Sequence, residues 1–400
     1  MKKNNGIYLV VVICMCGLIG TSLGLITNIA GLFFSPIAKE FHILRGSVSM
    51  TLTLSNLLSA LGGLLMPKLI KDQYLKPSLI FITFGISITS ILLGLTNSLP
   101  MMYLLHVIRG FLAGLISIVF ITIVVNNWFY ERVGLAMSVA LSFSGISGAI
   151  FSPIINHVIT NSGYRTGYFV VAIIAIILNL PAICLLPSIE PTYKGYQPYG
   201  YKEEESKEVT SNTALKPSNV IFVICCICAL IVTGFTSLTQ HFPGISQAYG
   251  YASTVGAMML SLTMISNSAA KVLLGHLIDT FGPKRPILLH CVILCLSTLS
   301  LLLFHSPMML YVASFFYGFI YSVANIGLAT LTKDSFGKEN YSKKYPTVSM
   351  IGTVGTALTA AGIGYVYDYT HSYTPILFTI LFLFILVTIL VGYCYRMIKN

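Results

Sequence analysis

PILFTILFLFILVTILVGYCY, the run of residues 375–395, contains no charged side chain and few polar ones. A helix needs about 20 apolar residues to cross the roughly 30 Å of hydrocarbon in a lipid bilayer. The run is long enough to do so, and it therefore predicts a membrane-spanning helix.

Eleven more apolar runs precede it when the chain is divided at charged residues and at breaks rich in Pro, Gly or Asn. The first six cover residues 7–34, 46–70, 77–96, 100–127, 133–159 and 167–187. The second six cover residues 218–242, 252–278, 286–304, 308–332, 345–367 and 375–396. We therefore predict an all-α membrane protein with twelve transmembrane helices.

Composition excludes other classes of protein. The 400 residues are 56% hydrophobic and 9% charged, whereas soluble proteins carry about 25% charged residues. Too few charges remain to cover a water-facing surface, which excludes soluble, coiled-coil, disordered and nucleic-acid-binding proteins despite the net charge of +11. All nine cysteines lie in apolar runs, and the cluster Cys225, Cys226 and Cys228 has no nearby His or acidic residue. We predict no disulfide framework, no metal site and no cofactor.

The basic residues predict the orientation in the membrane. With both termini in the cytoplasm, eighteen of the 23 Lys and Arg residues fall in cytoplasmic loops and tails, three fall outside and two fall within spans. Cytoplasmic loops of membrane proteins are enriched in Lys and Arg. We therefore predict a multi-pass protein of the cytoplasmic membrane. Its first helix is expected to be retained, because no small-residue cleavage site follows the basic start.

One stretch differs from its surroundings. Residues 188–217 are polar, mixed in charge and contain Pro and Gly, as expected for a mostly solvated cytoplasmic tether, with a regulatory role as the alternative. This linker divides the chain into an N-terminal six-helix bundle, residues 1–187, and a C-terminal six-helix bundle, residues 218–400.

The two halves also resemble each other at an offset of about 208 residues. The loop at residues 275–285 corresponds to residues 67–76, and Arg109-Gly110-Phe111 corresponds to Tyr317-Gly318-Phe319. A six-plus-six repeat with a cytoplasmic linker is typical of two-bundle transporters with a site between the halves.

These features resemble the major facilitator superfamily. Its loop motif, Gly-x-x-x-Asp-x-x-Gly-x-(Arg/Lys)-(Arg/Lys), is matched here by Gly275, Asp279, Gly282, Lys284 and Arg285. The resemblance implies a cytoplasmic conformational latch in which the Asp meets a helix N-terminus and a basic residue. The N-terminal copy departs from the motif at Pro67 and Lys71, so the latch in that half is expected to be weak or built differently. The resemblance also implies a monomer.

A narrower resemblance involves about fifty residues. Trp128-Phe129 through Gly134-Leu135-Ala136, followed by Gly163-Tyr164-Arg165, is similar to the signature of the monocarboxylate and oxalate/formate transporter branch. Residues 31–41 resemble the same branch. In this branch a cation of the eighth helix binds substrate, and Lys271 stands at the matching position, four residues before Gly275. Oxalate exchangers also carry a Lys in the eleventh helix. The corresponding run here, residues 345–367, contains no Lys, which favours a substrate with one carboxylate.

Two cations lie near the middle of predicted spans. Arg109 is about 12 Å from the outer end of the fourth span and Lys271 about 12 Å from the cytoplasmic end of the eighth, at 1.5 Å per residue. An ionised group in the bilayer interior costs at least about 2.5–3.5 kcal/mol. No acidic residue lies mid-span, so we expect the substrate to supply the anion. The alternatives are that Arg109 braces backbone carbonyls and that Lys271 extends to the cytoplasmic face.

Proton coupling has three candidate residues. His106 and His241 are titratable side chains within spans, and each could instead be a hydrogen-bonded interior histidine. Lys271 could lose its proton when the site is empty and regain it with the anion. Proton symport and anion exchange both remain open.

Tyr317, Tyr321 and Asn325 are spaced by four residues on the tenth predicted helix. That spacing predicts one helical face, which either lines a cavity suited to a small polar anion or packs against the eleventh helix.

We therefore predict a secondary transporter that moves a small organic anion, a monocarboxylate such as lactate or formate, by alternating access. Its partners are this anion, protons or a counter-anion, and the lipid bilayer, without nucleic acid. The alternatives are a drug or other solute/proton porter of the same superfamily and a transport-inactive sensor with the transporter fold. A membrane enzyme is disfavoured, because the sequence has no nucleophile motif, phosphate loop or metal cluster.

Overall fold

The computed structural model describes residues 5–201 and 219–398. The basic residues 1–4, the charged linker residues 202–217 and the chain end at 399–400, which contribute to the predictions above, lie outside the described residues.

Nearly all described residues are helical. The elements up to residue 201 are α1 (Asn5–Ile19), η1 (Gly20–Leu25), α2 (Gly31–Phe41), α3 (Arg45–Leu69), η2 (Asp72–Tyr74), α4 (Leu75–Leu95), α5 (Leu99–Leu115), α6 (Ile118–Trp128), α7 (Val133–Leu185) and η3 (Pro191–Lys194). Those from residue 219 onward are α8 (Asn219–Gly234), η4 (Phe235–His241), α9 (Phe242–Ala248), α10 (Ser253–Phe281), α11 (Lys284–Leu303), α12 (Pro307–Tyr317), α13 (Ile320–Ser322), η5 (Val323–Gly327), α14 (Leu328–Thr370) and α15 (Thr374–Met397).

Eleven helical stretches of the described chain are long and apolar enough to cross a bilayer. One of them, α7, has 53 residues, about 80 Å at 1.5 Å per residue, which exceeds twice the hydrocarbon thickness. The helix changes direction at Gly163, whose φ of 82° and ψ of 162° are non-helical and suit glycine. The predicted runs 133–159 and 167–187 lie on either side of this residue.

The spans Asn219–Ala248 and Pro307–Gly337 are interrupted by irregular helix, and the span Gly6–Leu25 ends in one. Gly20–Leu25 and Val323–Gly327 are π-helical, and Phe235–His241 is a 3-10 helix. Such interruptions leave backbone carbonyls without their usual partners, and within a bilayer other helices have to satisfy them. Thr356 Oγ1 donates to the Thr233 carbonyl at 2.8 Å, and Thr359 Oγ1 donates to the Gly234 carbonyl at 2.6 Å. These side chains of α14 thus stabilise the break between α8 and η4.

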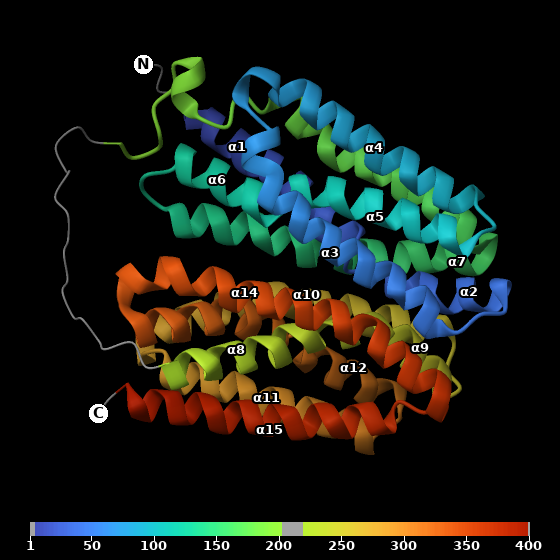
Figure 1. The fold of residues 1–400 in the computed structure, drawn as a ribbon. Helices are drawn as coiled ribbons and strands as arrows, with labels where there is room; N and C mark the ends of the chain where they lie inside the picture. Colours follow the sequence, from blue (N-terminus) through green and yellow to red (C-terminus); the bar gives the residue numbers. More distant parts are fainter. Residues whose placement is uncertain (1–4, 202–218, 399–400) are drawn as a thin grey trace. The chain divides into compact units, whose positions relative to one another are not determined.

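The chain forms two compact units. The first consists of Met1–Pro36 and Leu54–Thr210, and the second of Ile37–Thr53 and Ser211–Asn400. Within the first, α7 runs beside α1 and α4 (Figure 1). Within the second, α14 lies beside α8 and α11 beside α15 (Figure 1). The predicted N-terminal bundle, residues 1–187, includes residues 37–53. The structure groups these residues with the second unit.

Residues 188–201 (the 188–201 segment) belong to the first unit and pack against its helices α1 and α6. The buried indole of Trp128 donates to the Ser188 carbonyl at 3.0 Å, and the Tyr199 N–H donates to the Trp128 carbonyl at 2.8 Å. Tyr8 contacts the ring of Tyr199 at 5.2 Å and donates to the Gln197 carbonyl at 2.9 Å. Aromatic rings and backbone groups of these residues thus find partners on the bundle, while several of their side chains remain exposed. The predicted role of residues 188–217 as a tether stays a prediction.

Asp72 helps to hold the same segment. Its carboxylate accepts hydrogen bonds from the backbone N–H groups of Ile189 and Glu190, at 2.5 and 3.1 Å. Asp72 directly follows Lys71, the residue at the motif's Asp position. In the N-terminal half, Asp72 thus binds the backbone of the 188–201 segment. The family motif implies a different contact, in which the Asp meets a helix N-terminus and a basic residue.

Candidate functional site

Arg109 lies deep within its span. It is on α5, ten residues after Leu99, which corresponds to about 15 Å along the helix axis. The side chain is only 4% exposed. Gly110, its neighbour, brings α5 very close to α3: a Cβ on Gly110 would lie 2.3 Å from the Ser55 carbonyl oxygen. This close packing of backbones fixes the part of α5 that carries Arg109.

The Arg109 guanidinium has no charged or hydrogen-bonded partner among the residues that the structure describes. Its Nε is fully buried and unbonded. Its nearest defined contact is the ring of Tyr168, whose centroid lies 5.6 Å from Cζ. The alternative that Arg109 braces backbone carbonyls is thus not the arrangement seen here. Five N–H donors are available to an incoming anion.

His106 and Tyr168 complete the surroundings of Arg109. His106, one turn before Arg109 on α5, is 4% exposed, and its Nδ1 lies 2.9 Å from the Met102 carbonyl. Because a carbonyl only accepts hydrogen bonds, Nδ1 carries the proton and Nε2 is the acceptor in the neutral ring. Tyr168 of α7 is 2% exposed, stacks on Phe33 at 4.2 Å and contacts the His106 ring edge-on at 6.4 Å.

Lys271 lies on α10, ten residues before Phe281, about 15 Å along the axis. The side chain is half-buried, and it forms no hydrogen bond or ion pair with any residue between 5 and 201 or between 219 and 398. Asn267, one turn earlier on the same face, is 2% exposed, and its buried Oδ1 is unbonded. An ammonium donor and an amide acceptor thus share one face of α10.

His241 is bound to the backbone. It ends η4, is 3% exposed, and its Nε2 lies 3.0 Å from the Ala360 carbonyl of α14. Its ring also contacts Tyr373 at 6.3 Å. His241 is thus a hydrogen-bonded interior histidine, and its part in proton coupling stays a prediction.

Tyr317, Tyr321 and Asn325 have three different environments. Tyr317 is fully buried, donates to the Phe235 carbonyl at 3.0 Å and packs on Phe242 at 5.6 Å. Tyr321 is half-buried, with its hydroxyl 3.1 Å from Thr239 Oγ1. Asn325 is exposed and donates to the Tyr321 carbonyl at 2.7 Å. α12 ends at Tyr317 and Asn325 lies in the π-helix η5, so the three residues do not belong to one regular helix. Their role in lining a site stays a prediction.

The motif loop at residues 275–285 is short. α10 continues to Phe281 and α11 begins at Lys284, so Gly282 and Pro283 alone connect them. Gly282 has a φ of 73° and a ψ of 165°, a conformation that essentially only glycine adopts. Asp279 and Arg285 are exposed, Gly275 and Lys284 are intermediate, and within the described part of this unit the Asp279 carboxylate has no hydrogen-bonded partner.

Sequence reasoning did not identify Tyr168 and Asn267. Tyr168 stands four residues after Tyr164, and Asn267 four residues before Lys271, so helical spacing from already recognised residues could have identified both. Among the described residues, no group of three His, Cys, Asp or Glu side chains is arranged to hold a metal ion.

Comparisons with known proteins agree with this architecture. The family model of the Major Facilitator Superfamily matches residues 16–360 and 224–399. The structure of the nucleoside transporter NupG is similar with a TM-score of 0.71 at 13% identity, covering 98% of each chain. A bacterial homolog of the human lysosomal transporter Spinster, in an inward-facing and occupied conformation, has a TM-score of 0.70 at 12% identity, covering 99% of this chain and 98% of that one.

No curated protein sequence matches the chain. At these identities the similar structures establish the fold alone, whereas the family match extends over most of the sequence. The protein is therefore a member of the major facilitator superfamily, a multi-pass membrane transporter.

Proposed function

We propose that the protein carries a small organic anion with one carboxylate across the cytoplasmic membrane by alternating access. In this proposal α7 crosses the membrane twice, which gives twelve spans with both termini in the cytoplasm. The single observation that carries the proposal is the buried Arg109 guanidinium, which has no acidic partner in the described part of the chain.

The energetic argument is one of charge balance. Removing a cation from water costs several kcal/mol unless an anion and further hydrogen bonds compensate. Arg109 cannot be neutralised by deprotonation, because an arginine side chain keeps its charge in proteins. The cost is therefore compensated when a substrate carboxylate binds, and the planar guanidinium can hold both carboxylate oxygens.

Lys271 is the proposed second cation, in the other half of the sequence. Its ammonium lacks a partner among the described residues, and Asn267 offers an unbonded amide oxygen on the same face. Tyr321, whose hydroxyl lies 3.1 Å from Thr239 Oγ1, is the proposed substrate ligand of the tenth span. Tyr317 is left out of the proposed ligand set, since its hydroxyl is used by the Phe235 carbonyl.

A monocarboxylate such as lactate or formate fits this charge pattern best. Residues 345–367 contain no basic side chain, so the eleventh span offers no further cation for a second carboxylate. Coupling to protons is proposed to involve Lys271 or His106, whose Nε2 is an available acceptor. Exchange against another anion requires no such residue.

Uptake into liposomes by the purified protein tests the proposal. Labelled lactate, formate, acetate, oxalate and a nucleoside are supplied with and without an inward proton gradient. Arg109→Ala and Lys271→Ala are compared with wild type and with Lys68→Ala, which removes an exposed cation near the end of α3.

We expect monocarboxylate uptake that falls by about 10-fold to 100-fold in either span variant, because a charge-assisted hydrogen bond contributes about 1.5–3 kcal/mol. Lys68→Ala is expected to retain wild-type uptake. Uptake of the nucleoside alone, or equal monocarboxylate uptake by all four proteins, would overturn the proposal. Acceleration by an internal anion rather than by the proton gradient would identify exchange.

A further inference from the structure

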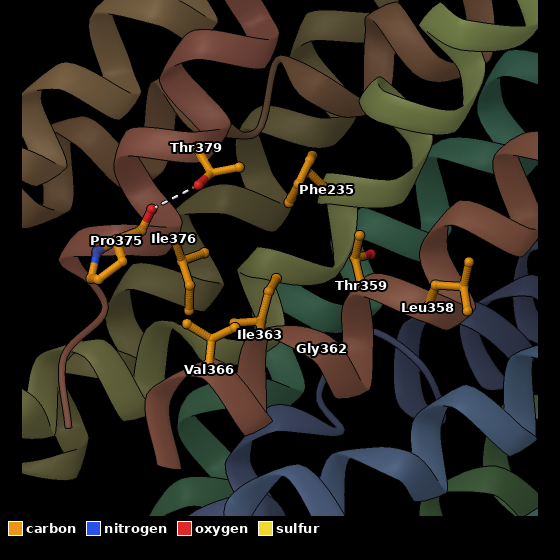
Figure 2. A pocket seen from close by; sticks show the side chains of 9 residues that line it. All are labelled: Phe235, Leu358, Thr359, Gly362, Ile363, Val366, Pro375, Ile376 and Thr379. Atoms are coloured by element: carbon orange, nitrogen blue, oxygen red, sulfur yellow. Dashed lines mark hydrogen bonds between the residues drawn. The ribbon is translucent and has the colours of Figure 1, made fainter. Parts of the chain in front are cut away.

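A cavity of about 300 Å³ lies in the second unit (Figure 2), and neither Arg109 nor Lys271 lines it. Phe235 of η4 forms one wall, Leu358, Thr359, Gly362 and further residues of α14 form another, and the first two turns of α15 close it. The volume is at the lower end of that of small-molecule sites.

The walls offer an occupant no free side-chain hydrogen-bond donor. Only two lining residues, Thr359 and Thr379, carry side-chain polar atoms. Thr359 Oγ1 donates to the Gly234 carbonyl at 2.6 Å, and Thr379 Oγ1 donates to the Pro375 carbonyl at 2.9 Å (Figure 2). Because both hydroxyl protons are already used, the cavity suits a purely apolar group.

The cavity lies at the depth of the hydrocarbon layer. Thr379 is five residues into the span Thr374–Met397, and Leu358 is twelve residues from the end of the span Lys343–Thr370. At 1.5 Å per residue these positions are about 8 and 18 Å from the ends of their spans. Leu358 is 65% exposed and Val366 is 38% exposed, so the opening of the cavity is on the apolar outer surface of these helices.

Gly362 leaves the cavity open. A Cβ at this position would have no atom within 4 Å, so the missing side chain creates space that no neighbour fills. Lining atoms beside an empty space lose dispersion contacts, and an apolar group that enters restores them. We propose that this cavity binds one acyl chain of a bilayer phospholipid.

The acyl chain would contact the break in the seventh span. Phe235 is the first residue of the 3-10 helix η4, and Thr359 satisfies the Gly234 carbonyl just before it. Gly234 itself packs against Gly355, with a Cβ position 3.2 Å from the Gly355 carbonyl carbon. An occupant that packs on both Phe235 and α14 stabilises the interrupted form of this span.

Photolabelling tests the proposal without any transport measurement, so its failure is distinct from failure of the anion-carrier proposal. The protein is reconstituted into phosphatidylcholine vesicles that contain a small fraction of phosphatidylcholine with a diazirine in one acyl chain. Labelled residues are identified by mass spectrometry. Gly362→Leu places a side chain in the cavity from a Cβ position that has no atom within 4 Å, and Val366→Phe narrows the opening.

Gly392→Leu is the matched control. It adds the same side chain to α15, where the nearest atom to a Cβ would be 3.9 Å away, and it lies outside the cavity. We expect Phe235, Ile363 and Ile376 to be labelled in wild type and in Gly392→Leu, and labelling to fall about fivefold in Gly362→Leu because the contact surface is filled.

Unchanged labelling of these residues in Gly362→Leu and Val366→Phe would overturn the proposal. Labelling of Phe235 no stronger than background in wild type would also overturn it. If a soluble apolar diazirine labels the cavity while the lipid probe does not, the occupant is a small apolar solute and the assignment to lipid is wrong.

Discussion

The Asp368 carboxylate accepts a hydrogen bond from the backbone N–H of Gly46, at 2.7 Å, across 322 residues of sequence. Its other oxygen accepts from the Arg45 N–H at 3.1 Å. These N–H groups belong to the first turn of α3, where helix donors have no partner within the helix. A residue of α14 thus caps α3, and the negative charge lies at the positive end of the helix dipole.

Replacing Asp368 by Ala is expected to lower the free energy of unfolding by about 0.5–2 kcal/mol, the usual range for loss of an N-terminal cap. Asp368→Asn should cost less, because its amide oxygen can still accept one hydrogen bond. Denaturant unfolding in detergent measures the difference. Asp279→Ala, which removes an exposed carboxylate at the end of α10, is the control, and an equal effect of both Ala variants would contradict the capping role.

Tyr373 makes the same cluster sensitive to alkaline pH. Burial raises the pKa of Tyr373 to about 12, and Arg45, whose Nη1 lies 3.4 Å from its hydroxyl, partly opposes the shift. The unfolded chain releases this proton near pH 10, so the folded form alone keeps it between pH 10 and 12. Stability therefore falls as pH rises through this window, by up to about 2.7 kcal/mol for two pKa units.

Unfolding of wild type and of Tyr373→Phe should be compared at pH 8, 10 and 11.5. We expect the variant to lose less stability than wild type between pH 10 and 11.5, since Phe does not titrate. Parallel losses in the two proteins would show that Tyr373 does not contribute.

Trp128→Phe should loosen the 188–201 segment. The change removes the N–H that bonds the Ser188 carbonyl and leaves a buried acceptor unpaired, which costs about 1–3 kcal/mol. We expect faster trypsin cleavage after Lys194, which is exposed. Tyr193→Phe, a change at an exposed ring beside the cleavage site, should leave the rate unaltered. If Trp128→Phe is cleaved no faster than wild type, the indole hydrogen bond does not hold this segment.

Gly110→Ala and Gly275→Ala should have opposite effects on stability. A Cβ at Gly110 would lie 2.3 Å from the Ser55 carbonyl oxygen, so α3 and α5 must move apart at a cost of about 1–3 kcal/mol. Gly275 lies within α10 and has no atom within 4 Å of its Cβ position. Ala there should stabilise the helix by about 0.5–1 kcal/mol. Thermal unfolding of both variants measures this contrast, and equal shifts would refute it.

The spans could be predicted because their determinants are local. A bilayer requires a certain length of apolar helix, and the run 286–304 appears as Lys284–Leu303. The predicted runs 133–159 and 167–187 correspond to the two parts of Val133–Leu185 on either side of Gly163, and the second run extends two residues beyond the helix. Arg109 and Lys271 could be predicted as mid-span cations for the same reason, because a charged residue within a long apolar run is rare.

The interruptions of helices could not be predicted, because they depend on donors from elsewhere in the chain. Phe235–His241 is a 3-10 helix next to Thr356 and Thr359 of α14, whose hydroxyls bond the carbonyls just before it. A regular helix was predicted for residues 308–332, and the π-helix η5 within it separates the environments of Tyr321 and Asn325.

The sequence by itself determined an all-helical membrane protein, the bounds of most spans and the two unpaired cations, because hydrophobic length and charge are properties of short segments. Only the tertiary structure decided that Arg109 is buried beside Tyr168 without an acidic partner among the described residues, that Tyr317 points into a core and that Asp368 caps α3. These outcomes depend on which distant side chains meet, and hydrogen-bond partners hundreds of residues apart leave no local pattern in the sequence.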